Sequence, residues 1–311
     1  MERVVVTIIG PTCSGKTSLS LMLAEELQTE IISADSRQIF KYLSIGTAKP
    51  TKEETDKIKH HFIDTLEPDV NYNISKFEID GLKVIEDLFS KNKIPVVVGG
   101  SGLYIKALVD GIINDVETDD EYRAELMKQR EEFGNEHIYN ILREVDPQSA
   151  ENMLPQNWKR VIRALEVFHI SGKPIWQHHN EQKRDTDIKF LQYGLNWDRE
   201  ILYKNIEKRV DQMVNDGLLA ELQNVLEMGF DRSVNALNTV GYKELYDFID
   251  EKITLERAIE LIKRDTRRFA KRQFTWFRRD ERIKWFDVNS ASDLSEIKNS
   301  ILKDLELKTG L

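Results

Sequence analysis

The residues from Gly10 to Thr17, GPTCSGKT, are the first group in the chain whose types and spacing could do chemistry. They fit the pattern G-x-x-x-x-G-K-[ST], in which glycines let backbone N–H groups curl around a phosphate at the start of a helix. Lys16 adds a positive charge, and the Thr17 hydroxyl suits a magnesium ion. The pattern predicts a phosphate-binding loop made of Gly10, Pro11, Thr12, Cys13, Ser14, Gly15, Lys16 and Thr17.

A second polar group, Ser33 to Gln38, follows the next apolar run and contains Asp35. If that run is a strand, Asp35 lies at the carboxyl edge of a sheet, where ligands bind in open α/β folds. A carboxylate there could act on a substrate. It could instead support magnesium or cap the next helix, and the spacing alone leaves both interpretations open.

A phosphate loop does not define a reaction, because kinases, ATPases and diphosphate-ester transferases all use one. Nucleotide hydrolases usually carry an acidic residue after a second apolar strand, where it holds magnesium. Here the apolar run 94–98 continues into Gly99-Gly100-Ser101-Gly102-Leu103-Tyr104. This sequence argues against routine nucleotide hydrolysis.

The elements that must position these groups alternate between strand and helix. Strands are predicted over 4–9, 30–34 and 94–98, and helices over 15–27 and 75–89. Such alternation is typical of a parallel sheet. A glycine turn that binds nothing, the alternative to a phosphate loop, does not account for the strand before the motif and the helix after it.

The strand pattern ends near residue 115. A charged helical segment follows over 115–187, with Asn157 as a helix N-cap and Gly172 with Pro174 as a stop. Beyond Phe190 the pattern predicts helices to the end of the chain. We therefore expect an α/β fold, with a P-loop NTPase-like parallel sheet, in three parts: 1–114, a helical insertion over 115–187, and a helical C-terminal region over 188–311.

The C-terminal region includes a long predicted helix over 255–277. Its expected apolar stripe consists of Leu255, Ala258, Ile259, Ile262 and Phe269. Basic residues lie largely on the opposite face, interleaved with aromatic ones: Arg264, Arg267, Arg268, Lys271 and Arg272. Such a face could contact RNA phosphates, although a solvated helix face over buried aromatics would look the same.

The charge of the chain is unevenly distributed. Its formal net charge is −9, yet the stretch from Arg257 to Lys284 holds eleven basic and four acidic residues. A single cysteine, Cys13, excludes an internal disulfide framework and fits a reducing cytoplasm. The run Val4 to Ile9 is too short to be a signal peptide or membrane span, so we expect no membrane association.

The chain resembles the tRNA dimethylallyltransferases, also called tRNA isopentenyltransferases. The resembling segments follow family order through almost the whole chain: GPTCSGKT at 10–17, ISADSRQIF at 32–40, IGTAKP at 45–50, GGSGLY at 99–104, RVIRALEVF at 160–168, VGYKEL at 240–245 and RRFAKRQFTWFRR at 267–279.

The resemblance implies transfer of a dimethylallyl group from dimethylallyl diphosphate to N6 of adenosine 37 in the tRNA anticodon stem-loop, with diphosphate released and Mg²⁺ as cofactor. It implies three catalytic residues: Asp35 as general base, Ser101 at a position that is usually threonine, and Arg209 on the diphosphate. The chemistry agrees, since cationic groups stabilise a departing diphosphate and a carboxylate assists a weak amine nucleophile.

Contacts with tRNA are expected at three places in the chain. They are Asp35, Ser36, Arg37 and Gln38; Gln156, Asn157, Trp158, Lys159, Arg160 and Arg163; and Arg268, Lys271 and Arg272. The reacting adenine must leave its stack to reach the edge of the sheet.

Three other functions remain open at this point. A nucleoside or nucleotide kinase would use the same scaffold, but it has no use for two basic helices. A relative that prenylates free AMP is disfavoured by the basic C-terminal region. An RNA-binding module with a vestigial loop is disfavoured by the intact Lys16 and Asp35. We expect a cytoplasmic monomer.

Overall fold

The computed structural model describes residues 2–112, 116–181 and 186–309. The chain divides into two compact units. Unit 1 comprises Met1–Val109 and Thr186–Leu311, and unit 2 comprises Asp110–Asp185. The predicted boundary between 114 and 115 lies outside the described residues, and 187 lies in unit 1.

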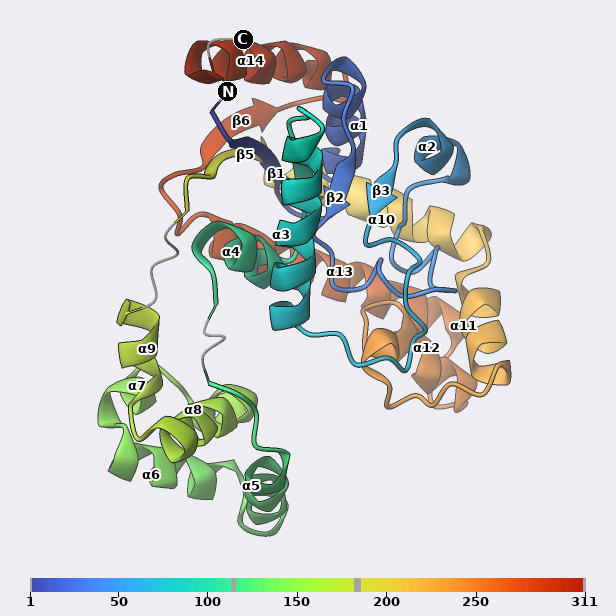
Figure 1. Ribbon diagram of the computed structural model, residues 1–311. Helices are drawn as coiled ribbons and strands as arrows, with labels where there is room; N and C mark the ends of the chain where they lie inside the picture. Colours follow the sequence, from blue (N-terminus) through green and yellow to red (C-terminus); the bar gives the residue numbers. More distant parts are fainter. Residues whose placement is uncertain (1, 113–115, 182–185, 310–311) are drawn as a thin grey trace. The chain divides into compact units, whose positions relative to one another are not determined.

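Unit 1 is built on a parallel sheet of six strands in the order β3-β2-β4-β1-β5-β6 (Figure 1). The strands are β1 (Val4–Ile9), β2 (Ile31–Ser33), β3 (His60–His61), β4 (Val96–Gly99), β5 (Lys189–Trp197) and β6 (Lys284–Val288). The chain leaves β1 towards β2 on one side and reaches β5 on the other. In such sheets the carboxyl end of a strand at this switch point is where ligands bind.

Both faces of the sheet are covered, because residues of the central strand point alternately to opposite sides. Val6 and Ile8 of β1 belong to the core that includes helices α1 and α14, whereas Val5 and Ile9 belong to the core that includes α3 and α4. Each buried aliphatic side chain stabilises this arrangement by about 1.5–3 kcal/mol. The continuous apolar run of β1 is therefore the sequence signature of a strand buried on both faces.

The helices of unit 1 connect the strands and extend the molecule beyond the sheet. They are α1 (Lys16–Glu26), α2 (Lys52–Lys57), α3 (Ile74–Ser90), α4 (Gly102–Asp110), α10 (Arg199–Asn215), α11 (Leu218–Glu227), the 3₁₀ turn η2 (Asn235–Leu237), α12 (Tyr242–Ile249), α13 (Leu255–Phe277) and α14 (Asp293–Thr309).

The expectation of helices to the end of the chain beyond Phe190 was wrong. The sheet continues there with β5, which pairs with β1, and with β6, which pairs with β5. Gln192 and Asn196 interrupt the apolar run of β5, so its periodicity alone does not mark a strand. Pairing with β1 determines its conformation, and this pairing joins segments about 180 residues apart in sequence.

The long predicted helix is confirmed as α13, Leu255–Phe277, and it begins where the Thr254 hydroxyl accepts a hydrogen bond from the Arg257 amide. Phe269, however, does not belong to the buried stripe, because it is 39% exposed. The buried side of the helix consists of Ala258, Ile262, Ala270, Gln273 and Phe277.

Unit 2 consists of helices around a small core of its own, formed by residues such as Leu126, Leu142 and Leu165. Gly172, with φ 69°, ends α8 as predicted. Asn157 occupies the N-cap position, but its side chain accepts a hydrogen bond from the Leu154 amide. The helices are α5 (Asp120–Phe133), α6 (Asn135–Val145), α7 (Pro147–Glu151), the 3₁₀ turn η1 (Pro155–Asn157), α8 (Trp158–Ser171) and α9 (Ile175–Glu181).

Among the described residues, no helix combines the length and the apolar composition that crossing a membrane requires.

Candidate functional site

The loop between β1 and α1 is held in shape by its own backbone and by two distant side chains. Gly15 has φ 86° and Cys13 has φ 62°, so the chain turns through left-handed conformations just before the helix. The indole Nε1 of Trp197 donates to the Ser14 carbonyl at 2.9 Å. The Thr12 amide donates to Oε1 of Gln273 at 2.8 Å. The sequence 10–17 therefore forms a fixed loop at the amino end of α1, which is the geometry of an anion site.

Lys16 is the cation of this loop. Its ammonium donates to the Pro11 carbonyl at 2.5 Å. The pKa of the Lys16 ammonium is lowered to about 8, chiefly by burial and in part by the positive charge of Arg209, whereas Cys13 and Asp35 act in the opposite direction. The positive charges of Lys16 and Arg209 repel each other, and a multivalent anion bound between them would relieve this repulsion.

The loop opens into a cavity of about 870 Å³ in unit 1. The cavity unites the motifs that the sequence singled out separately, including Lys16, Asp35, Ser101 and Arg209. Its volume is large enough for a diphosphate ester together with a purine base, the ligands that the family resemblance implies. Its remaining lining comes mainly from residues 46–50, 71–74, 235–243 and one side of α13.

Asp35 follows β2 at the carboxyl edge of the sheet, as expected. Its Oδ1 accepts hydrogen bonds from the amides of Arg37 at 2.8 Å and Gln38 at 3.3 Å. Within the described residues, Oδ2 has no hydrogen-bond partner. One oxygen thus fixes the carboxylate, and the other is available to a ligand in the cavity.

The residues around Asp35 are tied to the rest of unit 1. The Ser101 hydroxyl accepts a hydrogen bond from the Ser36 amide at 3.1 Å. The Arg37 guanidinium donates to the carbonyl of Asn235 at 2.6 Å, and the Gln38 side-chain amide donates to the Thr47 and Ala48 carbonyls. The Arg37 and Gln38 side chains are therefore held by the chain itself, and their predicted contact with tRNA stays a prediction.

Gln273 and Trp276 bring α13 against the phosphate loop and the start of α4. The Gln273 side chain bridges the Thr12 amide and the Gly100 carbonyl, the latter at 3.0 Å. A Cβ on Gly102 would lie 2.2 Å from the Trp276 ring, so only glycine permits this approach. Trp276 is 40% exposed and lines the cavity, as does Phe269.

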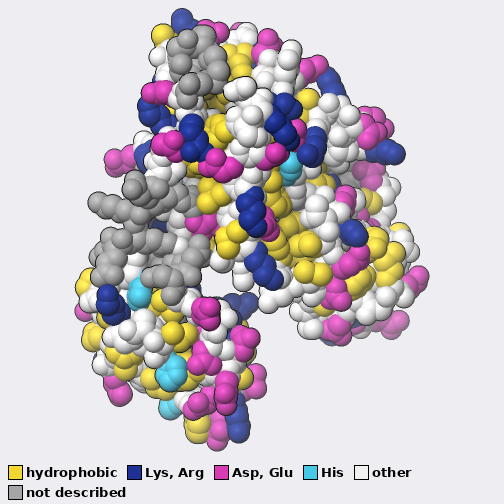
Figure 2. Space-filling view, viewed as in Figure 1, with side chains coloured by type: hydrophobic (Ala, Val, Ile, Leu, Met, Phe, Trp, Pro, Cys, Tyr) yellow, Lys and Arg dark blue, Asp and Glu magenta, His cyan; other side chains and the backbone are white. Residues whose placement is uncertain are grey.

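The basic side chains of α13 differ in their partners. Arg264 and Arg268 form ion pairs with Asp265, and Arg267 forms one with Glu207. Lys271 and Arg272 are exposed and have no acidic partner within 4.0 Å in the part of the chain that the structure describes. Figure 2 shows acidic and basic side chains interspersed over one face of the molecule, so cations such as these two matter more than total charge.

In unit 2, the predicted basic residues also divide into two kinds. Lys159 and Arg160 are exposed on α8, next to Trp158, whose ring lies under the Arg130 guanidinium at 4.1 Å. Gln156 is exposed in η1. Arg163 instead donates to the buried carboxylate of Glu166 at 2.5 Å and to the carbonyls of Val116 and Glu117, which gives it a role inside unit 2.

For a metal ion, the cavity offers few protein ligands. Thr17 lines it beside Lys16 at the start of α1. The described residues contain no group of three His, Cys, Asp or Glu side chains that could hold a metal. A single hydroxyl ligand such as that of Thr17 suits magnesium, which usually keeps several waters and is held largely by the phosphates of a substrate.

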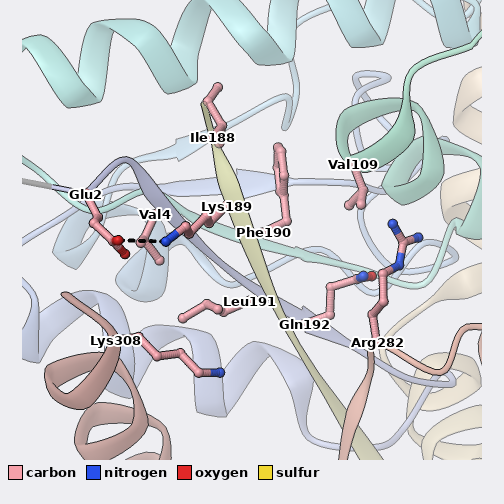
Figure 3. Close-up of a pocket in the computed structure, with 10 residues that line it drawn as sticks. All are labelled: Glu2, Val4, Val109, Ile188, Lys189, Phe190, Leu191, Gln192, Arg282 and Lys308. Atoms are coloured by element: carbon pink, nitrogen blue, oxygen red, sulfur yellow. Dashed lines mark hydrogen bonds and ion pairs between the residues drawn. The ribbon is translucent and has the colours of Figure 1, made fainter. Parts of the chain in front are cut away.

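A second cavity, of about 500 Å³, lies at the beginning of β1 and β5 (Figure 3). Its charged side chains already have partners: Lys189 pairs with Glu2, Lys308 with Asp304, and Arg282 with Asp280. Because each of these charges is neutralised by its partner, the cavity attracts a charged ligand only weakly.

Several residues that line or support the main cavity were missed in the sequence. Gln273 carries a recognisable signal, since it is a glutamine on the buried stripe of an amphipathic helix, where an uncompensated amide would be costly. Asn235, Asn238 and Glu221 carry no such signal, because their partners lie between about 175 and 200 residues away in the sequence.

Residues 38–280 match the model of the family described as IPP transferase. The chain is 45% identical over 302 residues to the tRNA dimethylallyltransferase of Acetivibrio thermocellus, covering 96% of each chain. It is 42% identical over 308 residues to the tRNA dimethylallyltransferase of Carboxydothermus hydrogenoformans, covering 98% of each.

Two solved structures are similar over nearly the whole chain. The full-length tRNA isopentenylpyrophosphate transferase from Bacillus halodurans is 38% identical with a TM-score of 0.72, covering 100% of this chain and 99% of that one. A eukaryotic dimethylallyltransferase acting on tRNA is 28% identical with a TM-score of 0.85, covering 99% of this chain and 80% of that one.

Proposed function

Because the chain belongs to the tRNA dimethylallyltransferase family, also described as the IPP transferases, we propose that it transfers a dimethylallyl group from dimethylallyl diphosphate to N6 of adenosine 37 in tRNA. One observation carries the proposal: Lys16 of the phosphate loop lines the same cavity as Asp35, one of whose carboxylate oxygens has no hydrogen-bond partner among the described residues. A cation for the leaving group and a carboxylate for the nucleophile are the two parts that this reaction requires.

At the donor end, the amides of the phosphate loop, Lys16 and Arg209 hold the diphosphate. Cleavage of the allylic C–O bond leaves its electron pair on the diphosphate, so negative charge grows there as the bond breaks. Arg209 has no acidic partner in the described part of the chain and is exposed to the cavity. Its charge and that of Lys16 stabilise the departing group more strongly in the transition state than in the substrate.

At the acceptor end, Asp35 serves as the general base. As the N6–carbon bond forms, the amine must lose a proton, and Oδ2 of Asp35 accepts it. Ser101 supports this arrangement through the Ser36 amide, and a serine hydroxyl accepts that hydrogen bond as a threonine hydroxyl would. The usual threonine is therefore not required for this contact.

Magnesium fits the donor end, where the Thr17 hydroxyl would be its protein ligand and the diphosphate and waters would complete its shell. When bound, it neutralises part of the negative charge on the diphosphate.

The RNA is held by exposed cations and aromatic rings, of which Phe269, Arg272 and Trp276 also line the cavity. Lys271 and Arg272 lie on α13 next to Phe269 and Trp276, a pairing of phosphate-binding and base-stacking groups. In unit 2, Lys159 and Arg160 with Gln156 and Trp158 form the second proposed contact.

The direct test is a reaction of the chain with dimethylallyl diphosphate, magnesium and an unmodified anticodon stem-loop, read by mass spectrometry of the RNA. We expect one dimethylallyl group on adenosine 37, and none on a stem-loop with guanosine at that position. Parallel reactions contain AMP as acceptor, or ATP with a nucleoside. Prenylated AMP without prenylated RNA, or phosphoryl transfer from ATP, would replace the proposed function by one of its alternatives.

A further inference from the structure

Glu221, on α11, binds the loop formed by residues 44–48, which lies about 175 residues earlier in the sequence. Its Oε2 accepts hydrogen bonds from the amides of Ser44 and Ile45, both at 2.7 Å. Its Oε1 accepts one from the Gly46 amide at 2.8 Å and another from the Tyr242 hydroxyl at 2.7 Å. Three consecutive backbone donors thus converge on one carboxylate.

The loop needs such an acceptor because its amides point the same way and find no strand or helix partner. Ala48, in this loop, has φ 49°, a left-handed conformation that a residue other than glycine seldom adopts. A Cβ on Gly46 would lie 2.4 Å from the Tyr242 ring. The loop is therefore fixed by the carboxylate of Glu221 and by close contact with the ring of Tyr242.

The other end of the loop reaches Asp35 through Gln38. The carbonyls of Thr47 and Ala48 accept hydrogen bonds from Nε2 of Gln38, at 3.2 and 3.1 Å. Oε1 of Gln38 accepts one from the Ser33 hydroxyl at 3.0 Å, and the Gln38 amide donates to Oδ1 of Asp35. A continuous series of hydrogen bonds therefore connects Glu221, through the loop 44–48 and Gln38, to Asp35.

We propose that Glu221 is a positioning residue for the reaction, which aims the Asp35 carboxylate through the loop 44–48 and Gln38. The inference rests on the proposed function for its consequence on catalysis. It does not require Glu221 to touch either substrate, and Glu221 is not among the residues that line the cavity. Since the phosphate loop takes no part in the series, the donor site should not depend on Glu221.

The test is Glu221→Gln, which keeps the size of the side chain but replaces one acceptor oxygen by an NH₂ group that cannot accept. We expect kcat to fall about 10- to 100-fold, the order of loss that a displacement of about 1 Å causes at a reacting group. KM for dimethylallyl diphosphate should stay within about twofold, because the donor groups keep their places.

Two control variants are compared with Glu221→Gln: one should have no effect on kcat, and the other a smaller effect. Glu54→Gln changes a half-buried carboxylate outside the cavity that accepts a single backbone hydrogen bond in the capping box of α2, and it should leave kcat unchanged. Tyr242→Phe removes one of the four hydrogen bonds to Glu221, so its effect should be several-fold smaller than that of Glu221→Gln. A normal kcat for Glu221→Gln, with or without a lower melting temperature, would overturn the proposal.

A double-mutant cycle with Gln38→Ala separates positioning from a general loss of structure. If Glu221 acts through Gln38, the double variant should lose no more kcat than the worse single variant, because both changes break one series of contacts. If the two effects multiply, Glu221 acts by another route and the proposal fails.

Hydrogen exchange provides a readout that does not depend on catalysis. In Glu221→Gln, the amides of residues 44–46 and then of 37–38 should lose protection, while those of residues 12–17 keep it. Unchanged protection of 37–38 would contradict the proposal even if the wild-type chain proved to catalyse a different reaction. Absence of prenylated RNA from the wild-type chain would instead reject the proposed function alone.

Discussion

The two ends of the cavity are built in different ways. The donor loop, residues 10–17, is one contiguous segment that takes its turn from left-handed residues between a strand and a helix, and two distant side chains, Trp197 and Gln273, hold its backbone. The acceptor loop, residues 35–48, is held by several distant segments: the Ser101 and Glu221 side chains accept hydrogen bonds from its amides, and the Asn235 carbonyl accepts one from its Arg37 side chain. Anion binding needs only backbone amides in a local turn, whereas aiming a carboxylate at a nucleophile needs support from several directions.

This contrast predicts that damage to the acceptor loop slows the chemical step while donor binding survives, and that damage to the donor loop affects both. The following measurements test that division, from the largest expected effect to the smallest.

Asp35→Asn should reduce kcat by about 10²- to 10⁴-fold, because an amide cannot accept the proton of N6. The amide oxygen can still accept from the Arg37 and Gln38 amides, so the loop should keep its shape. KM for the donor and the affinity for the stem-loop should change only a few fold. Steady-state kinetics and a filter-binding assay provide the measurements, and near-normal turnover would remove Asp35 from the mechanism.

Lys16→Met should weaken donor binding and slow the reaction together, by about 10²-fold in kcat/KM, because the ammonium meets the diphosphate before and after its charge grows. The methionine fills a similar volume without a charge. Titration of the variant with dimethylallyl diphosphate gives the binding part, and single-turnover kinetics give the rate. A variant with unchanged donor affinity would show that the loop does not hold the diphosphate.

Exchange of Lys271 and Arg272 for glutamine should weaken RNA binding about tenfold and spare the donor site. For every RNA phosphate that a variant no longer binds, the slope of log affinity against log salt should become shallower by about 0.7 to 0.9. Arg264→Gln and Arg267→Gln serve as matched controls, because ion pairs with Asp265 and Glu207 already engage these side chains. Equal slopes for all these variants would mean that the exposed face of α13 is merely solvated.

The smallest expected effect is a dependence of donor affinity on pH that originates at Lys16. Its pKa is lowered to about 8, so the ammonium is charged below that pH and progressively neutral above it. Affinity for dimethylallyl diphosphate should therefore stay constant up to about pH 7.5 and fall several-fold by pH 9. Calorimetry at a series of pH values measures this fall, which Lys16→Met should abolish; a fall that persists in the variant belongs to another group.

Local patterns in the sequence predicted much of the fold and of the donor site. The strand Val4–Ile9, the long helix α13 and the phosphate loop each occupy one continuous segment, and their periodicity and turn residues are visible without knowledge of the rest. The position of Asp35 after a strand could also be predicted, because the carboxyl end of a parallel strand is a defined place in such a sheet.

The tertiary structure alone decided which residues support that chemistry. The strand β5 exists because β1 lies beside it, and Phe269 faces the cavity because the other side of α13 packs against the core. Arg37 and Glu221 meet partners more than 170 residues away, so their sequence neighbours carry no trace of those contacts. Periodicity reports the environment of a segment, whereas a hydrogen bond between distant segments depends on how the whole chain folds.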